Sequence, residues 1–368
     1  MQRTKPPFRA DHVGSLLRPI VLKDGRYLRA RGEIEADELE DVEDGEVETV
    51  IRKQEEVGLK SITDGEFRRS WWHLDFWWGL KGVERVKMAE GIQFHGIQTR
   101  ADGLKVTGKV DFADHPMLGH FRFLKEHTKQ TAKMTIPSPS VFHWRVGRND
   151  ISKDAYPDLE GFFEDAGKTY RKAVRAFYDA GCRYLQLDDV AWAMLASPDQ
   201  HDSFRKRGDD PANLPAAYAR MMNAALQDKP SDMTITTHVC RGNYRSTWIA
   251  EGGYEPVAER LFGGVNVDGY FLEYDSERAG GFEPLRFIPK GDKQVVLGLV
   301  TTKVGQLEDK DTLKRRIDEA TKYVSLDQLC LSPQCGFAST EEGNTLAEDE
   351  QWDKLRLIVE VADEVWGK

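Results

Sequence analysis

His238 and Cys240 place an imidazole and a thiol two positions apart in a short apolar stretch. Residues two apart on an extended strand point to the same side of a sheet, so both side chains can reach one metal ion. Zinc favours such mixed nitrogen and sulfur ligands. The spacing alone is common, but Glu273 and Cys335 stand at the ends of two other apolar stretches. Together the four residues favour a zinc site over a buried histidine with two inert thiols.

Polar side chains also end other short apolar stretches, at Ser15, Glu66 and the pair Asp188-Asp189. Each has a structural alternative, because Ser15 or Asp188 could cap a following helix and Glu66 could pair with a nearby arginine. Their recurrence after several stretches favours a shared site.

The elements that must position these residues alternate between apolar strands and helix-length stretches. The expected strands are residues 12–15, 61–66, 134–138, 184–189, 235–240, 270–274, 295–300 and 329–333. The expected helices are residues 37–57, 159–180, 214–226, 311–324 and 347–366. This alternation predicts a parallel sheet, and eight strands predict a single (β/α)8 TIM barrel over residues 1–368, with an open doubly wound sheet as the rival. In such barrels the site lies at the C-terminal ends of the strands.

Residues from about 76 to 129 interrupt the alternation after the second strand. The apolar and polar residues of 104–110 alternate, which is typical of a half-buried strand. We expect a hairpin insertion over one end of the barrel. The aromatic run of residues 71–78 precedes it and could line a pocket or pack beneath the insertion.

The composition excludes several classes of protein. Among the 368 residues, 40% are hydrophobic and 31% are charged, which is typical of a globular chain. The net charge of −10 disfavours binding to nucleic acid or to an anionic membrane. No apolar run approaches the roughly 20 residues of a membrane span, and residues 1–9 lack the pattern of a signal peptide. We therefore expect a cytoplasmic protein in which Cys182 and Cys330 are small buried hydrophobic residues. The sequence leaves its oligomeric state open.

Several motifs resemble those of the catalytic barrel of cobalamin-independent methionine synthases. The resemblance is greater to the single-barrel proteins that are related to these synthases. They are ADHVGS (10–15), TDGE (63–66), LQLDD (185–189), THVC (237–240), FLE (271–273) and SPQCG (332–336). Each motif is modest by itself, but their order along nearly the whole chain is specific.

The resemblance implies a catalytic zinc and a thiol substrate. The implied zinc ligands are His238, Cys240, Glu273 and Cys335. Homocysteine would be bound with its carboxylate near Ser15 and its amine at Glu66 and Asp188. Trp144 matches the tryptophan that stacks on the pterin of methyl-folate in the family, although a packing role is the alternative.

The chain departs from the family pattern in three ways. It lacks the second, N-terminal barrel of the full-length synthases, and Asp189 stands where the family usually has glutamate. The family's catalytic histidine near the seventh strand has no counterpart, and Lys303 is the residue nearest to that position. Lys303 is thus the candidate acid, and the methyl donor stays open.

Other functions remain possible at this point. Similar zinc barrels transfer alkyl groups from epoxides to coenzyme M, so another thiol is one alternative. A metal-free lyase resembling uroporphyrinogen decarboxylases and a non-catalytic barrel with structural zinc are the others.

Overall fold

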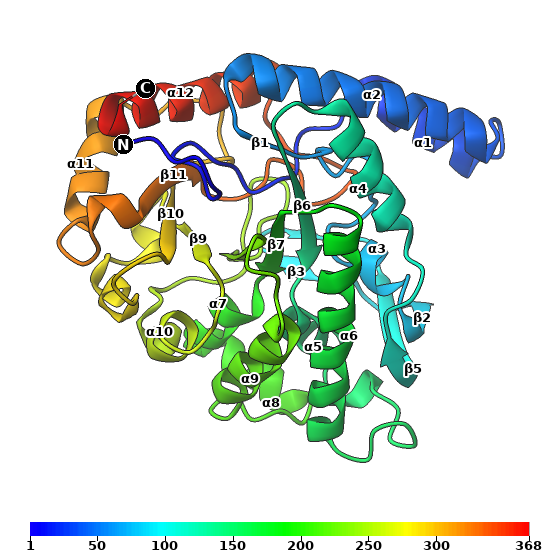
Figure 1. Ribbon diagram of the computed structural model, residues 1–368. Helices are drawn as coiled ribbons and strands as arrows, with labels where there is room; N and C mark the ends of the chain where they lie inside the picture. The colour runs from blue at the N-terminus through cyan, green and yellow to red at the C-terminus, as the bar shows by residue number, and fades with distance from the viewer. Residues whose placement is uncertain (368) are drawn as a thin grey trace.

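The computed structural model describes residues 1–367. At its centre lies a parallel sheet of seven strands, ordered β1-β6-β7-β8-β9-β10-β11 (Figure 1). The strands are β1 (Ser61–Ile62), β6 (Thr131–Pro137), β7 (Tyr184–Asp189), β8 (Thr234–Val239), β9 (Gly269–Glu273), β10 (Gln294–Val300) and β11 (Leu329–Pro333). They are almost entirely buried, which explains their runs of aliphatic residues.

Residues 9–16 fill the eighth position of the barrel without forming the strand that we expect at 12–15. Asp11 N donates to Leu331 O at 3.0 Å on one side, and Leu16 N donates to Gly65 O at 3.0 Å on the other. Between these two bonds, backbone carbonyl groups accept hydrogen bonds from buried side chains. Gln186 Nε2 donates to Val13 O, and Thr63 Oγ1 donates to Gly14 O. These side-chain bonds replace a regular strand ladder, and the prediction of a strand there is wrong. The barrel architecture itself is confirmed.

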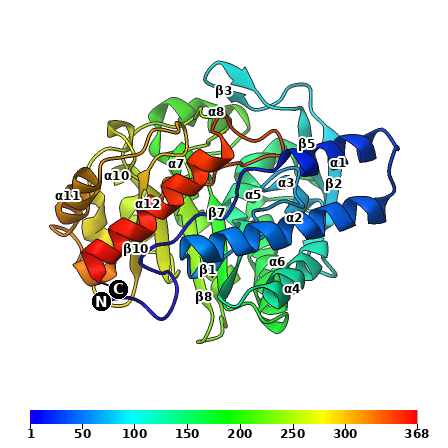
Figure 2. The same ribbon diagram turned by 90° about the horizontal axis from the view of Figure 1, so that it is seen from above.

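Helices cover the outside of the barrel (Figures 1 and 2). The longer ones are α2 (Ala36–Val57), α4 (Pro116–His127), α6 (Leu159–Asp179), α9 (Leu214–Leu226), α10 (Glu255–Phe262), α11 (Lys310–Ala320) and α12 (Glu348–Trp366). Shorter helices, α5 (Pro139–Val146), α7 (Ala191–Ala196) and α8 (His201–Lys206), follow β6 and β7. The apolar face of α6 buries three phenylalanines, and Asp158 caps the helix by accepting from Gly161 N. No helix within residues 1–367 is long and apolar enough to span a membrane.

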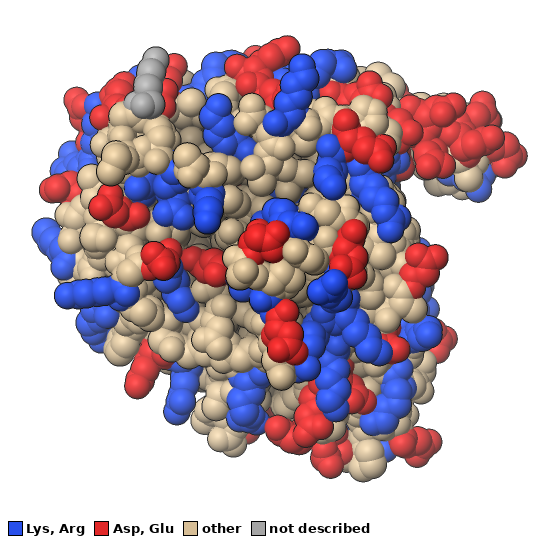
Figure 3. Space-filling model, viewed as in Figure 1, with Lys and Arg blue, Asp and Glu red and all other residues tan. Residues whose placement is uncertain are grey.

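The α1 (Ile20–Ala30) and α2 helices form a hairpin that projects from the barrel (Figures 1 and 2). Acidic side chains gather on its projecting end, whereas both signs of charge are mixed over the rest of the visible face (Figure 3). Part of the negative net charge is therefore concentrated on this hairpin.

The chain between β1 and β6 contains a short helix and two antiparallel pairs of strands. These elements are α3 (Leu74–Trp77), β2 (Lys81–Lys87), β3 (Gln93–Phe94), β4 (Ile97–Gln98) and β5 (Asp102–Asp111). β2 pairs with β5, and β3 pairs with β4 at the tip. His95 N donates to Trp248 O across to the segment after β8. This places the tip beside the C-terminal ends of the strands.

Candidate metal centre

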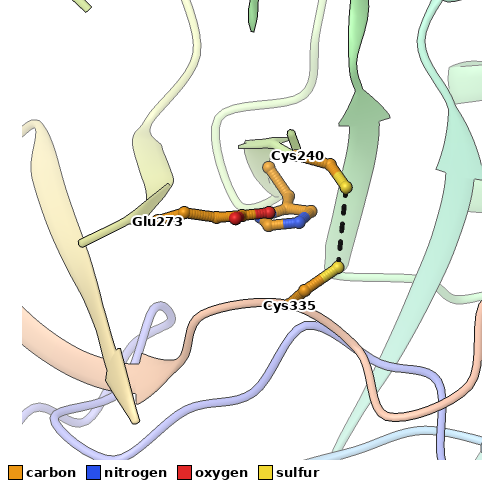
Figure 4. A group of neighbouring side chains, drawn as sticks. Cys240, Glu273 and Cys335 are labelled. Carbon is orange, nitrogen blue, oxygen red and sulfur yellow. Dashed lines mark hydrogen bonds between the residues drawn. The ribbon is translucent and has the colours of Figure 1, made fainter. Parts of the chain in front are cut away.

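The four candidate metal ligands come together at the C-terminal ends of three strands. His238 lies on β8, Cys240 follows it, Glu273 ends β9 and Cys335 follows β11. One ligand atom from each residue lies within 4.8 Å of all the others, and all four residues are buried. The two sulfur atoms are 3.6 Å apart, and Figure 4 shows Cys240, Glu273 and Cys335 converging from different segments.

The unpartnered atoms of this cluster fit a metal ion. Within the described chain, neither ring nitrogen of His238 has a hydrogen-bond partner, and Glu273 Oε2 has none either. A buried polar group without a partner costs about 1–3 kcal/mol, so a free ring nitrogen and a free carboxylate oxygen within 4.8 Å of two thiols indicate a missing common partner. One nitrogen, one oxygen and two sulfurs are a donor set that zinc accepts in tetrahedral geometry.

Neighbouring groups hold the ligands in place. Asn243 Nδ2 donates to Glu273 Oε1 at 2.6 Å and to Cys240 Sγ at 3.4 Å. The backbone N–H groups of Arg241 and Gly242 donate to the same two ligands. Despite burial, the hydrogen bond with Cys335 holds the pKa of Cys240 well below its usual value. Cys240 is therefore prepared to bind as a thiolate.

A cavity opens directly beside the cluster. It encloses about 600 Å³, counting space that is open to solvent. Its lining includes seven residues singled out from the sequence: Ser15, Glu66, Trp144, Asp188, His238, Cys240 and Cys335. The structure thus brings the expected metal and substrate residues to one place.

Glu66 is held in a strained conformation at this cavity. Its φ of 61° lies in the left-handed region, which costs a non-glycine residue of order 1 kcal/mol or more. Thr135 donates to Glu66 Oε1 at 2.7 Å and Arg69 lies 3.3 Å from the same oxygen, whereas Oε2 has no partner among the described residues. Burial raises the pKa of Glu66. A cation entering the cavity would satisfy the free oxygen.

Asp188 and Asp189 are neighbours in sequence with different surroundings. Asp188 lines the cavity, accepts one hydrogen bond from Gln186, and burial raises its pKa to about 7. Asp189 instead accepts from Ser138 Oγ at 2.5 Å and from Ala191 N at 2.7 Å, at the start of α7. Asp189 is absent from the cavity lining, so its position indicates a structural role.

Ser15 stands against the loop that carries Cys335. A Cβ atom at Gly336 would lie 2.0 Å from Ser15 Oγ, so only glycine allows this approach. Ala338 N donates to Ser15 Oγ at 3.4 Å. The contact joins the substrate side of the cavity to the metal side.

Lys303, the candidate acid, is directed away from the cavity. Its ammonium lies 2.9 Å from Asp275 Oδ2. Arg278 lies 3.7 Å from the other oxygen of Asp275 and 3.5 Å from Glu273 Oε2. Lys303 lines a separate small cleft with Asn243 and Thr302. The sequence analysis missed Asp275, Arg278 and Asn243, although Asn243 stands only three residues after Cys240.

Cys182 and Cys330 lie in the packed interior. Both are fully buried, and burial raises the pKa of each to about 12. Neither lines the cavity, in keeping with their expected role as small hydrophobic residues.

Comparisons with known proteins identify relatives of this chain. The chain is 54% identical over 366 residues to the uncharacterized protein YxjH of Bacillus subtilis (strain 168), covering 99% of this chain and 96% of that protein. The structure of the putative vitamin-B12 independent methionine synthase from Listeria monocytogenes is 46% identical, with a TM-score of 0.81 and full coverage of both chains.

A more distant structure shares the fold. The B12-independent methionine synthase from Shewanella sp. W3-18-1, in complex with selenomethionine, is 19% identical and has a TM-score of 0.73, with 97% of each chain covered. The family model described as the catalytic domain of cobalamin-independent synthase matches residues 12–364. Because that match spans nearly the whole chain, the protein belongs to the family of cobalamin-independent synthase catalytic domains.

Proposed function

We propose that this protein is a zinc-dependent S-methyltransferase that methylates the thiol of homocysteine to give methionine. The main support is the cluster of four ligand atoms, which lie within 4.8 Å of one another. It stands beside the carboxyl groups of Glu66 and Asp188 in one cavity. Family membership supports methyl transfer to homocysteine. The Shewanella protein was solved with selenomethionine, the selenium analogue of this product.

His238, Cys240, Glu273 and Cys335 would hold the zinc. When bound, zinc deprotonates a thiol near neutral pH while leaving its sulfur nucleophilic. Asn243 keeps Glu273 and Cys240 oriented through its two hydrogen bonds. The aromatic and aliphatic lining of the cavity excludes water from the reacting sulfur.

Glu66 and Asp188 would bind the ammonium group of the substrate. Both line the cavity, and Glu66 Oε2 has no partner in the described chain. An ammonium between them would restore the charge on both carboxylates, whose pKa values burial raises. Ser15 Oγ would donate to the substrate carboxylate from the opposite loop.

The same charges disfavour coenzyme M as the thiol. Its sulfonate is an anion, and among the described residues no lysine or arginine lines the cavity. The metal-free lyase alternative leaves both ring nitrogens of His238 and the Oε2 atom of Glu273 without a hydrogen bond in the described chain. A purely structural zinc would give no purpose to Glu66 and Asp188 at the cavity wall.

Two measurements test the proposal. Elemental analysis of protein purified without chelator should find about one zinc per chain. Isotope-labelled donors should give labelled methionine from homocysteine, detected by mass spectrometry, and no product from coenzyme M. Absence of zinc, or alkylation of coenzyme M alone, would refute the proposal.

A further inference from the structure

We propose that the methyl donor taken by this cavity is an alkyl sulfonium cation. The proposal rests on the proposed function for the thiol acceptor and for methyl transfer, and it adds the chemical class of the second substrate. Three features carry it: the carboxyl groups of the cavity, its aromatic lining, and the position of Lys303, the candidate acid, outside the cavity.

The charges that line the cavity are negative. Glu66 and Asp188 are its only carboxyl side chains, and no lysine or arginine lies in its wall within residues 1–367. Two cations lie behind this wall without lining it: Arg69 lies 3.3 Å from Glu66 Oε1 and donates to Thr135 O, and Lys303 donates to Asp275. A donor that carries several carboxylates would find no counter-charge in this wall, whereas a cationic donor would.

Aromatic side chains line the same cavity as the carboxyl groups. Trp72, Phe94 and Trp144 line it, together with aliphatic residues. Aromatic faces attract cations with methyl groups, including onium ions, by about 0.5–2 kcal/mol each. Phe94 is the last residue of β3, so the pair of strands at the tip of the insertion contributes to the wall.

His73 belongs to the same wall and adds no positive charge. It is 2% exposed, and its ring lies 4.6 Å from that of Trp72 and 5.2 Å from that of Trp77. Burial and the charge of Arg145 hold the pKa of His73 well below its usual value. Both ring nitrogens lack partners in the described chain. A neutral imidazole with a free lone pair accepts contacts from the polarised C–H groups of a sulfonium.

A sulfonium also removes the need for an acid. The thiolate sulfur of homocysteine forms a bond to the methyl carbon, and the bond from that carbon to the sulfonium sulfur breaks. The bonding pair stays on the leaving sulfur, which becomes a neutral thioether, so no proton is required. When methyl-folate gives up its methyl group, the leaving group is a basic amine nitrogen, which must be protonated. Lys303, the candidate acid, is paired with Asp275 outside the cavity.

The test compares donors and measures binding independently of turnover. S-methylmethionine is the sulfonium probe, its uncharged carbon isostere is the binding control, and methyl-folate is the family-type donor. We expect a kcat/KM with homocysteine that is roughly 10²–10⁴-fold higher for the sulfonium than for methyl-folate. By calorimetry the sulfonium should bind at least about tenfold more tightly than its isostere.

Variants of the cavity tryptophans test where the sulfonium binds. Trp72→Leu and Trp144→Leu should each weaken sulfonium binding by about 2- to 30-fold, and Trp144→Phe should restore most of the loss. Trp78→Leu is the matched control, because Trp78 belongs to the same aromatic run but contacts Arg85 and Gly103 instead of the cavity. Zinc content in each variant shows that the fold persists.

The outcomes separate the two proposals. Methionine formed from methyl-folate but not from the sulfonium would overturn the donor class while leaving the proposed function intact. Equal binding of the sulfonium and its isostere would overturn it as well. Sulfonium binding that depends on Trp72 and Trp144, without methylation of homocysteine, would support the onium site and refute homocysteine as the acceptor.

Discussion

Two pairs of cysteines occupy the same barrel with different surroundings. Cys182 and Cys330 have no exposure at all, and Cys240 and Cys335 are 9% and 4% exposed, so all four are buried. Burial raises the pKa of Cys182 and Cys330 to about 12. The hydrogen bond between Cys240 and Cys335 instead holds the pKa of Cys240 well below its usual value and raises that of Cys335. Buried position therefore does not decide the chemistry of a thiol; the convergence of other donors at the strand ends does.

Asp188 and Asp189 repeat the contrast with carboxyl groups. The hydrogen bonds of Asp189 with Ser138 and Ala191 hold it at the start of α7. Asp188 keeps capacity for a further partner inside the cavity. In both comparisons the residue that we propose to be functional is the one that lines the cavity.

The largest effect is expected from replacing the two cysteines of the cluster. The Cys240→Ser, Cys335→Ser double variant should lose bound zinc almost completely, because two of four ligands are removed. The matched Cys182→Ala, Cys330→Ala variant should keep about one zinc per chain, with a stability loss of roughly 1–3 kcal/mol from cavity formation. Elemental analysis and thermal unfolding measure both. Zinc retained in the first variant would refute the ligand assignment.

The next effect tests the carboxyl comparison. Asp188→Asn and Glu66→Gln should each weaken homocysteine binding by about 2–4 kcal/mol, since each removes a charged partner of the ammonium in a dry pocket. Zinc content should not change. Asp189→Asn is the matched control, and it should lower the free energy of unfolding by about 1–3 kcal/mol through weaker bonds to Ser138 and Ala191. Calorimetric titration of homocysteine decides, and unchanged affinity in both cavity variants would place the amine elsewhere.

A smaller effect is expected at Asn243, which orients two ligands without being one. Asn243→Leu should weaken zinc binding about 10- to 100-fold, because ligand-orienting hydrogen bonds typically contribute that much. Competition with a chromophoric chelator measures the affinity. Asn223→Leu serves as control, since Asn223 bonds Gly264 and Asn266 far from the cluster. Equal zinc affinity in the two variants would contradict an orienting role.

The smallest effect is expected at Lys303. Lys303→Gln keeps a hydrogen-bond donor for Asp275 and should change kcat by less than about threefold on zinc-loaded protein. Steady-state kinetics with homocysteine and the best donor measure it. A collapse of kcat with unchanged donor binding would identify Lys303 as the acid and would require it to leave Asp275 during turnover.

The sequence by itself determined seven strands of the barrel and the helices α2, α6, α9, α11 and α12, whereas α4 and α10 were not among the expected helices. Apolar runs such as residues 184–189 and 294–300 and the periodic faces of α6 and α9 predict strands and helices, because backbone pairing and burial follow local patterns. The alternation of these elements predicts a parallel barrel, and strand ends in such a barrel predict where His238, Glu273 and Cys335 gather. Residues 10–16 do not follow this pattern, because buried side chains donate to the backbone carbonyl groups that would otherwise pair with a neighbouring strand.

Only the tertiary structure decided which atoms meet. Cys240 and Cys335 are 95 positions apart and reach 3.6 Å through closure of the barrel, which no local pattern encodes. Packing likewise turned Lys303 toward Asp275, turned Asp189 toward Ser138 and left His73 unpartnered among tryptophans. These outcomes depend on side-chain directions and on competition among neighbours that come from distant segments. The physical reason is that periodicity specifies the face of an element, whereas hydrogen-bond partners are set by whatever packs against that face.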